Sequence, residues 1–237
     1  MKYLFVIFIF FVGFNAQAQK QFVVDPDAVV REISGSFNSI KVSSGIHVYL
    51  SYADVEVCAV SASEDKYRQG IKTEIINGEL HIYYAGDKIR YGNNFKMNVY
   101  VAYKSLGQLK ASGASNIFIA GIMELPLLNV LLSGASQLRG QIKIDELNMK
   151  LSGASEVKLL GIVKNVNIEC SGASDVKAYE LIAENCNIKV SGASDVNITV
   201  TKELAANASG ASNIFYKGVA ELKIKQTSGA SSVARVE

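Results

Sequence analysis

The tetrapeptide Ser-Gly-Ala-Ser occurs seven times in this chain, at intervals of 18 to 21 residues. The copies begin at Ser112, Ser133, Ser152, Ser171, Ser191, Ser209 and Ser228. A unit with a mean length near 19 residues is too short to enclose a core of its own. Stacked units can bury one continuous interior, so the repeat predicts an array in which each unit packs on its neighbours.

Apolar and polar residues alternate on both sides of each copy. After the third copy Val157 and Leu159 are the apolar positions, and Val166, Ile168 and Cys170 precede the fourth. A period of two is typical of strands with one buried face, and a helical period of 3.6 does not fit these runs. We therefore predict an all-β fold, a parallel β-solenoid (β-helix) with coils of about 19 residues.

Glycine is the second residue of every copy. Because glycine lacks a Cβ atom, it adopts positive φ angles easily, and we expect each copy to form a corner of its coil. These structural turn glycines are Gly113, Gly134, Gly153, Gly172, Gly192, Gly210 and Gly229. The motif serines are too numerous and too regular to be nucleophiles, so the tetrapeptide is interpreted as scaffold.

The N-terminus has the pattern of a secretory signal peptide over residues 1–18. Met1–Lys2 is followed by the apolar run Tyr3–Phe14 and the small-residue site Ala16-Gln17-Ala18. This run is shorter than the roughly 20 apolar residues that a membrane-spanning helix needs. We expect cleavage after Ala18, export of the chain, and no transmembrane segment in the mature protein.

Residues 19–105 lack the tetrapeptide but are also rich in predicted strands, and we expect this module to be continuous with the SGAS-repeat β-helix of residues 106–237. Ser44-Gly45 resembles a degenerate first copy of the motif. Asn77-Gly78 joins the runs Ile71–Ile76 and Leu80–Tyr84, a strong hairpin signal. A short helical turn is expected within Ser63–Gly70.

Two further patterns concern register. An outward asparagine stands four residues before four of the motifs, and stacking predicts amide hydrogen bonds along this column of Asn129, Asn148, Asn167 and Asn187. Leu222 and Ile224 have the opposite parity to the apolar residues of the other coils, so we expect a bulge there.

Acidic residues share one outward column of the strand that follows the motif. Glu156, Asp175 and Asp195 would lie about 5 Å apart, where like charges repel. Bound Ca²⁺ would relieve the repulsion. The adjacent Arg139, Lys158 and Lys177 would relieve it equally well as salt-bridge partners, and paired carboxylates also suit glycosidase chemistry. The three interpretations remain open at this stage.

The sequence offers few other residues that could bind a metal, catalyse a reaction or bind nucleic acid. His47 and His81 are predicted to point outward and offer no metal cluster. Cys58, Cys170 and Cys186 are an odd number of cysteines, and we expect small buried side chains. A Cys170–Cys186 bridge requires their columns to meet. The net charge of +2 and the absence of a basic tract argue against nucleic acid as a partner, and no cofactor is expected.

The pattern Phe37-x-x-Ile40-x-Val42-x-x-Gly45-Ile46-x-Val48, followed by seven SGAS copies, resembles one family. It is similar to the head GIN domain of auto-transporter adhesins, a domain of unknown function. The resemblance implies a single-stranded right-handed β-helix in exported proteins of Gram-negative bacteria of the Bacteroides group. Such a protein would be periplasmic, at the cell surface or extracellular. The resemblance carries over no catalytic residues.

These patterns favour an exported, non-enzymatic β-helix that binds a glycan or a cell-envelope protein along its side or end. An open end of a solenoid exposes strand edges, so a homo-oligomer joined through the ends is a further hypothesis. The alternatives are a carbohydrate-active β-helix enzyme and a purely structural envelope protein.

Overall fold

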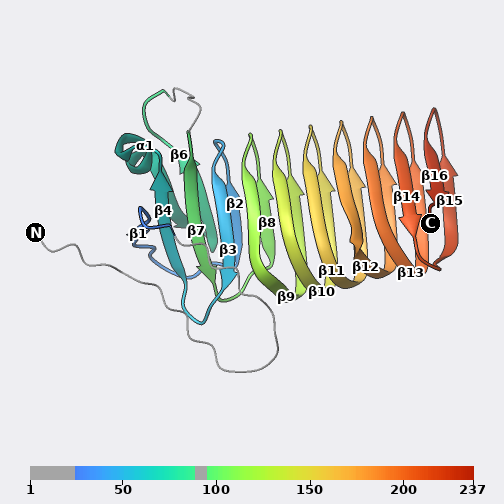
Figure 1. Cartoon of the computed structure of the whole chain (residues 1–237), viewed down its shortest axis with the longest axis horizontal. Helices are drawn as coiled ribbons and strands as arrows, with labels where there is room; N and C mark the ends of the chain where they lie inside the picture. Colours follow the sequence, from blue (N-terminus) through green and yellow to red (C-terminus); the bar gives the residue numbers. More distant parts are fainter. Residues whose placement is uncertain (1–24, 89–94) are drawn as a thin grey trace, which may run out of the picture.

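Long strands wound side by side into a rod make up most of the molecule (Figure 1). The computed structural model describes residues 25–88 and 95–237, in which it shows a nearly all-β chain forming a β-solenoid of about seven turns. The predicted fold class is confirmed. The predicted signal peptide, residues 1–18, lies outside the described residues.

The elements follow one another along the chain as β1 (Val29–Arg31), β2 (Ser39–Val42), β3 (His47–Tyr52), β4 (Val57–Ala62), α1 (Asp65–Gly70), β5 (Ile71–Ile76), β6 (Glu79–Tyr84), β7 (Met97–Tyr103), β8 (Gln108–Ala111), β9 (Asn116–Leu132), β10 (Gln137–Leu151), β11 (Glu156–Cys170), β12 (Asp175–Val190), β13 (Asp195–Ala208), β14 (Asn213–Lys217), β15 (Glu221–Thr227) and β16 (Ser232–Arg235).

Each strand from β9 to β13 runs from one SGAS copy to the next and bends on the way. In β11 the buried side chains are Val157 and Leu159, then Val163, then Val166, Ile168 and Cys170. The inward spacing therefore changes from two to four and then to three residues. These two departures from a spacing of two are corners, which give each coil a short third side around Val163.

Successive coils pair in parallel with equivalent positions in register, so each inward position becomes an apolar column. One such column runs through Leu138, Val157, Val176, Val196 and Ile214, each 0% exposed. Complete burial of side chains of this kind contributes about 1.5–3 kcal/mol each. The core is thus a stack of repeated contacts between neighbouring coils.

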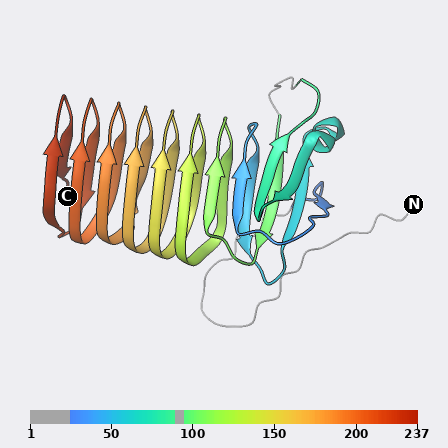
Figure 2. The ribbon, with the colours of Figure 1, turned by 180° about the vertical axis from the view of Figure 1, so that it is seen from behind.

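The degenerate motif of the front end belongs to the same stack. Ser44 and Gly45 have φ angles of 69° and 73°, and the flanking strands β2 and β3 pair in parallel with β8 and β9. Beyond them β4 pairs antiparallel with β7, β1 with β4, and β5 with β6. Figure 2 shows these strands and α1 at the N-terminal end of the rod. The predicted hairpin at Asn77-Gly78 and the helical turn are confirmed.

The C-terminal end is built differently. Leu204 pairs with Leu222 but Ala205 pairs with Ile224, so Lys223 is an extra residue in β15. This register shift is the predicted bulge. Six of the seven β15 residues are exposed, and only Leu222 is half-buried.

Candidate functional site

The SGAS corners are occupied by their own structural contacts. All seven predicted turn glycines have φ angles between 70° and 78°. A Cβ atom on Gly153 would lie 2.5 Å from the carbonyl oxygen of Gly134, so a side chain has no room there. The buried last serine of the motif is also used internally, since Ser155 Oγ donates to the carbonyl oxygen of Ser152 at 2.8 Å.

The acidic column of Glu156, Asp175 and Asp195 forms as predicted, because the three residues pair in register. Glu156 accepts hydrogen bonds from the side chains of Lys177 and Arg139, the latter at 2.8 Å. The bond from Lys177, reinforced by the charge of Arg139, holds the pKa of Glu156 below its ordinary value, although partial burial opposes this shift.

The other two carboxylates have separate partners. Lys177 Nζ lies 3.9 Å from Asp175 Oδ2, and Asp195 Oδ1 accepts a hydrogen bond of 2.9 Å from Asn213. Within residues 25–88 and 95–237 no group of three or more His, Cys, Asp or Glu side chains is placed to hold a metal ion. Basic side chains thus contact Glu156 and Asp175, whereas Asp195 contacts an amide.

The two histidines lie apart, with different partners. His47 Nδ1 is 3.1 Å from Asn116 Nδ2, and burial, assisted by the charge of Lys96, lowers the pKa of this histidine. His81 Nε2 lies 2.9 Å from Glu79 Oε1. Glu79 also accepts a bond from Lys110 at 2.6 Å, so its charge is already compensated.

The three cysteines are buried and free, as expected for small core residues. Cys170 pairs with Val190 and Cys186 pairs with Val166, so the two columns do not meet and the bridge considered from sequence is not formed. Burial raises the pKa of Cys58 and Cys170 to about 12. These thiols are therefore protonated at neutral pH and unsuited to nucleophilic chemistry.

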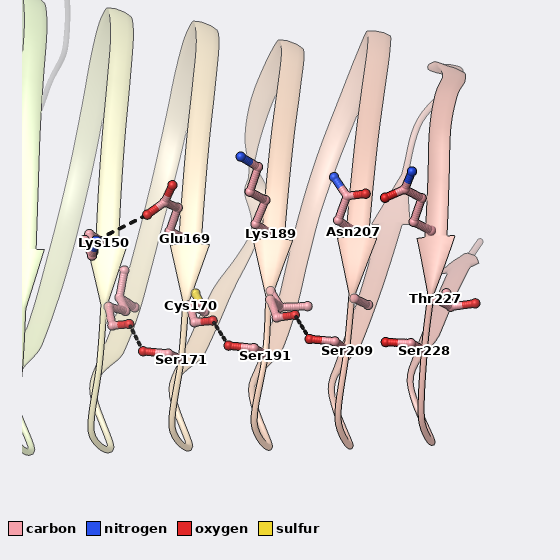
Figure 3. A pocket seen from close by; sticks show the side chains of 14 residues that line it. Lys150, Glu169, Cys170, Ser171, Lys189, Ser191, Asn207, Ser209, Thr227 and Ser228 are labelled. Atoms are coloured by element: carbon pink, nitrogen blue, oxygen red, sulfur yellow. Dashed lines mark hydrogen bonds and ion pairs between the residues drawn. The ribbon is translucent and has the colours of Figure 1, made fainter.

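A groove crosses five successive coils where the strands enter the SGAS corners (Figure 3). We call it the corner groove, and its volume is about 640 Å³. One wall is an outward column made up of Lys150, Glu169, Lys189, Asn207 and Gln226. The other wall is the column of first motif serines, Ser171, Ser191, Ser209 and Ser228.

The serine wall is held in place by hydrogen bonds between coils. Ser171 Oγ donates to the carbonyl oxygen of Leu151 and Ser191 Oγ to that of Cys170, both at 3.3 Å, and Ser209 repeats the pattern at 3.4 Å (Figure 3). Each of these three hydroxyls donates its single proton to a backbone carbonyl of the preceding coil. Its oxygen lone pairs remain available to accept hydrogen bonds from the groove.

The opposite wall carries charge. Lys150 Nζ lies 3.5 Å from Glu169 Oε2, and both side chains are exposed. Lys189 is also exposed and forms no ion pair within the part of the chain that the structure describes. Between the walls lies the last inward residue of each strand, and all four are buried: Leu151, Cys170, Val190 and Ala208.

The sequence did not predict the corner groove, although it predicted both neighbouring features, the asparagine column and the motif serines. The available signal was the outward position two residues before each motif, which reads Lys150, Glu169, Lys189, Asn207 and Gln226. The asparagine column itself forms in part. Asn148 donates to Asn129 at 3.2 Å and Asn167 to Asn148 at 2.8 Å, and among the described residues the series of bonds does not extend to Asn187.

In the described ranges no helix is long and apolar enough to cross a membrane.

Solved structures similar to this chain share its architecture at low sequence identity. A putative adhesin from Bacteroides fragilis matches with a TM-score of 0.78 and 19% identity, over 88% of this chain and 97% of its own. A putative lipid binding protein from Parabacteroides distasonis matches with a TM-score of 0.67 and 19% identity, over 89% and 96%. A putative adhesin from Parabacteroides merdae matches with a TM-score of 0.65 and 20% identity, over 89% and 95%.

At these identities the likeness concerns the fold alone. No curated protein shows a significant sequence match to the chain. The family model described as "Putative auto-transporter adhesin, head GIN domain" matches residues 36–220, which span the strands from β2 to β14. The chain therefore belongs to this adhesin head GIN domain family.

Proposed function

We propose that this protein is an exported, non-enzymatic binding module that holds an extended glycan or cell-envelope partner along the side of its solenoid. The observation that carries the proposal is the corner groove, which presents polar side chains at the same position of five successive coils. A repeated surface of this kind suits a partner with a repeat of its own.

The absence of activated groups within the described residues supports a binding role. The motif serines donate to backbone carbonyls, the cysteines are buried, and Glu156 is held in its charged form by basic neighbours. A general acid of a glycosidase needs a raised pKa, which is opposite to the shift at Glu156.

Export rests on the N-terminal sequence pattern and on family membership. We propose that residues 1–18 are removed and that the mature protein is periplasmic or located at the cell surface. N-terminal sequencing of the protein from cell fractions tests this: a first residue of Gln19 in an extracytoplasmic fraction supports it, and an intact Met1 in the cytoplasm contradicts it.

At the C-terminal end of the solenoid, the exposed strand β15 disfavours self-association. The exposed strand β15 carries Lys223 in a bulge together with Lys225, two features that discourage pairing with another strand edge. We therefore expect a monomer in light scattering at low concentration. A stable dimer at that concentration would require an interface elsewhere.

The binding proposal is tested with the purified protein on a glycan array and in a pull-down from envelope extracts, alongside turnover assays with the same glycans. Retention of a glycan or an envelope protein without cleavage is the expected result. Cleavage of a retained glycan would instead support a carbohydrate-active enzyme, and no retained partner would support a purely structural protein.

A further inference from the structure

We propose that the corner groove binds an extended acidic glycan, with the chain lying along the solenoid axis and its carboxylates at Lys150 and Lys189. This inference rests on the proposed binding function and specifies its site and ligand class. It follows from the spacing of the charges and from the hydrogen-bonding groups of the two walls.

The two lysines of the wall stand two coils apart. Lys150, Glu169 and Lys189 pair in register on three successive strands. Because paired strands lie about 4.8 Å apart, the two lysine positions are separated by roughly 10 Å along the axis. This separation is close to the length of one disaccharide in an extended pyranose chain. A glycan with one carboxylate per disaccharide therefore places successive carboxylates at the two lysines.

Lys189 is the stronger of the two anchors. Lys150 forms an ion pair with Glu169 at 3.5 Å, whereas Lys189 has no ion-pair partner in the residues described. The side chain of Lys189 projects from the wall between Glu169 and Asn207 (Figure 3). A carboxylate at Lys189 forms a charge-assisted hydrogen bond. Glu169, between the two lysines, accepts a hydrogen bond from a hydroxyl or N-acetyl group of the intervening sugar.

The remaining groups match sugar hydroxyls. The oxygens of Ser171, Ser191 and Ser209 accept hydrogen bonds at each coil, because their protons are directed to the scaffold. Asn207 and Gln226 add amide donors and acceptors at the far end. Val190 and Ala208, between the walls, are buried in the core, so the groups that face a ligand are those of the two walls.

A polypeptide strand fits this groove less well. Strand addition requires unpaired backbone groups at a sheet edge. In the groove the backbone is already paired between coils, as where Ser191 N donates to Cys170 O at 2.9 Å and Ser209 N donates to Val190 O at 3.0 Å. Binding must therefore use side chains, and those present here are hydroxyls, amides, ammonium groups and the carboxylate of Glu169.

The test is isothermal titration calorimetry of the purified protein with a hyaluronan dodecasaccharide at low ionic strength. A neutral chito-oligosaccharide of the same length is the comparison ligand. Lys189→Glu is the test variant, Lys189→Gln removes only the charge, and Lys158→Glu is the matched control. Lys158 is likewise an exposed strand lysine without an ion pair in the described residues, but it lies outside the groove.

We expect tighter binding of the acidic ligand than of the neutral one. Lys189→Gln weakens binding of the acidic ligand about fivefold, as expected for the loss of one exposed charge pair. Lys189→Glu weakens this binding further, and Lys158→Glu leaves it unchanged. Circular dichroism and thermal melts confirm that each variant is folded. Equal binding of both ligands overturns the acidic class, and a larger effect of Lys158→Glu than of Lys189→Glu overturns the site.

Two outcomes separate this inference from the proposed function. If neither oligosaccharide binds while another glycan or an envelope protein is retained in the array or pull-down, the inference fails and the binding function stands. If nothing is retained in any of these experiments, both fail.

Discussion

A single methyl group at a motif glycine would collide with the coil before it. At Gly153 the φ angle is 75° and an added Cβ would lie 2.5 Å from the carbonyl oxygen of Gly134. We predict that Gly153→Ala costs about 3 kcal/mol or more of unfolding free energy in urea titrations. Gly121 is the control, because its φ is 79° but nothing lies within 4 Å of its added Cβ. Gly121→Ala should cost about 1 kcal/mol, and equal losses would show that close stacking is unimportant.

Glu156 gives the stability a pH dependence of known sign. Its folded-state pKa is lowered by Lys177 and Arg139, so the stabilisation is present above the unfolded value near 4.5 and is lost as the pH falls through the folded value. Glu156→Gln should therefore cost about 1 kcal/mol at pH 7, and its difference from the unmodified protein should shrink in acid. Glu180→Gln, at an exposed position, should show no such trend. A difference that is constant with pH would contradict the salt-bridged interpretation.

At the scale of the element, two substitutions in the asparagine column should differ in their effect on the free energy of unfolding. Asn148 donates to Asn129 and accepts from Asn167, so Asn148→Ala should cost about 1–2 kcal/mol of unfolding free energy. Asn187 stands in the same column beyond the last of these bonds, and Asn187→Ala should change the stability by less than about 0.5 kcal/mol. Equal effects of the two substitutions would mean that the bonds along the column contribute nothing.

Strand architecture could be predicted where one residue type forces the geometry. Glycine at each corner, Asn77-Gly78 in the hairpin and the inverted parity of Leu222 and Ile224 all specify backbone shape directly. The sequence does not show in this way where a strand shifts register to fit neighbours of a different repeat length. Strand β12 shifts register against both neighbouring strands around residues 178–182, where Tyr179 and Glu180 are exposed and Leu181 is buried.

The corner groove could not be predicted because it depends on a second column of side chains as well as on parity. The sequence places Lys150, Glu169 and Lys189 outward, but the groove also requires the first motif serines to stand beside them as a second wall. For the acidic column the sequence predicted the alignment of Glu156 with Asp175 correctly. The sequence could not give the positions of the Arg139 and Lys177 side chains, which determine the contacts of Glu156.

For the whole molecule, the two ends should differ in local stability. The N-terminal end is covered by α1 and antiparallel strands, whereas β15 is almost fully exposed. Stability in a solenoid is the sum of coil and neighbour terms, so a coil with one neighbour opens first. Hydrogen exchange should therefore be faster for β15 and β16 than for β10 to β12. Uniform exchange along the rod would indicate a single cooperative unit.

The central claim is that the side of the solenoid holds an extended acidic glycan in a groove spanning five coils. Its most direct test is the affinity of the protein for hyaluronan fragments of increasing length, measured by calorimetry. If the ligand lies along the groove, affinity rises with each added disaccharide and stops rising once the chain spans the five coils. Affinity that does not depend on length, or no binding at any length, would contradict the claim.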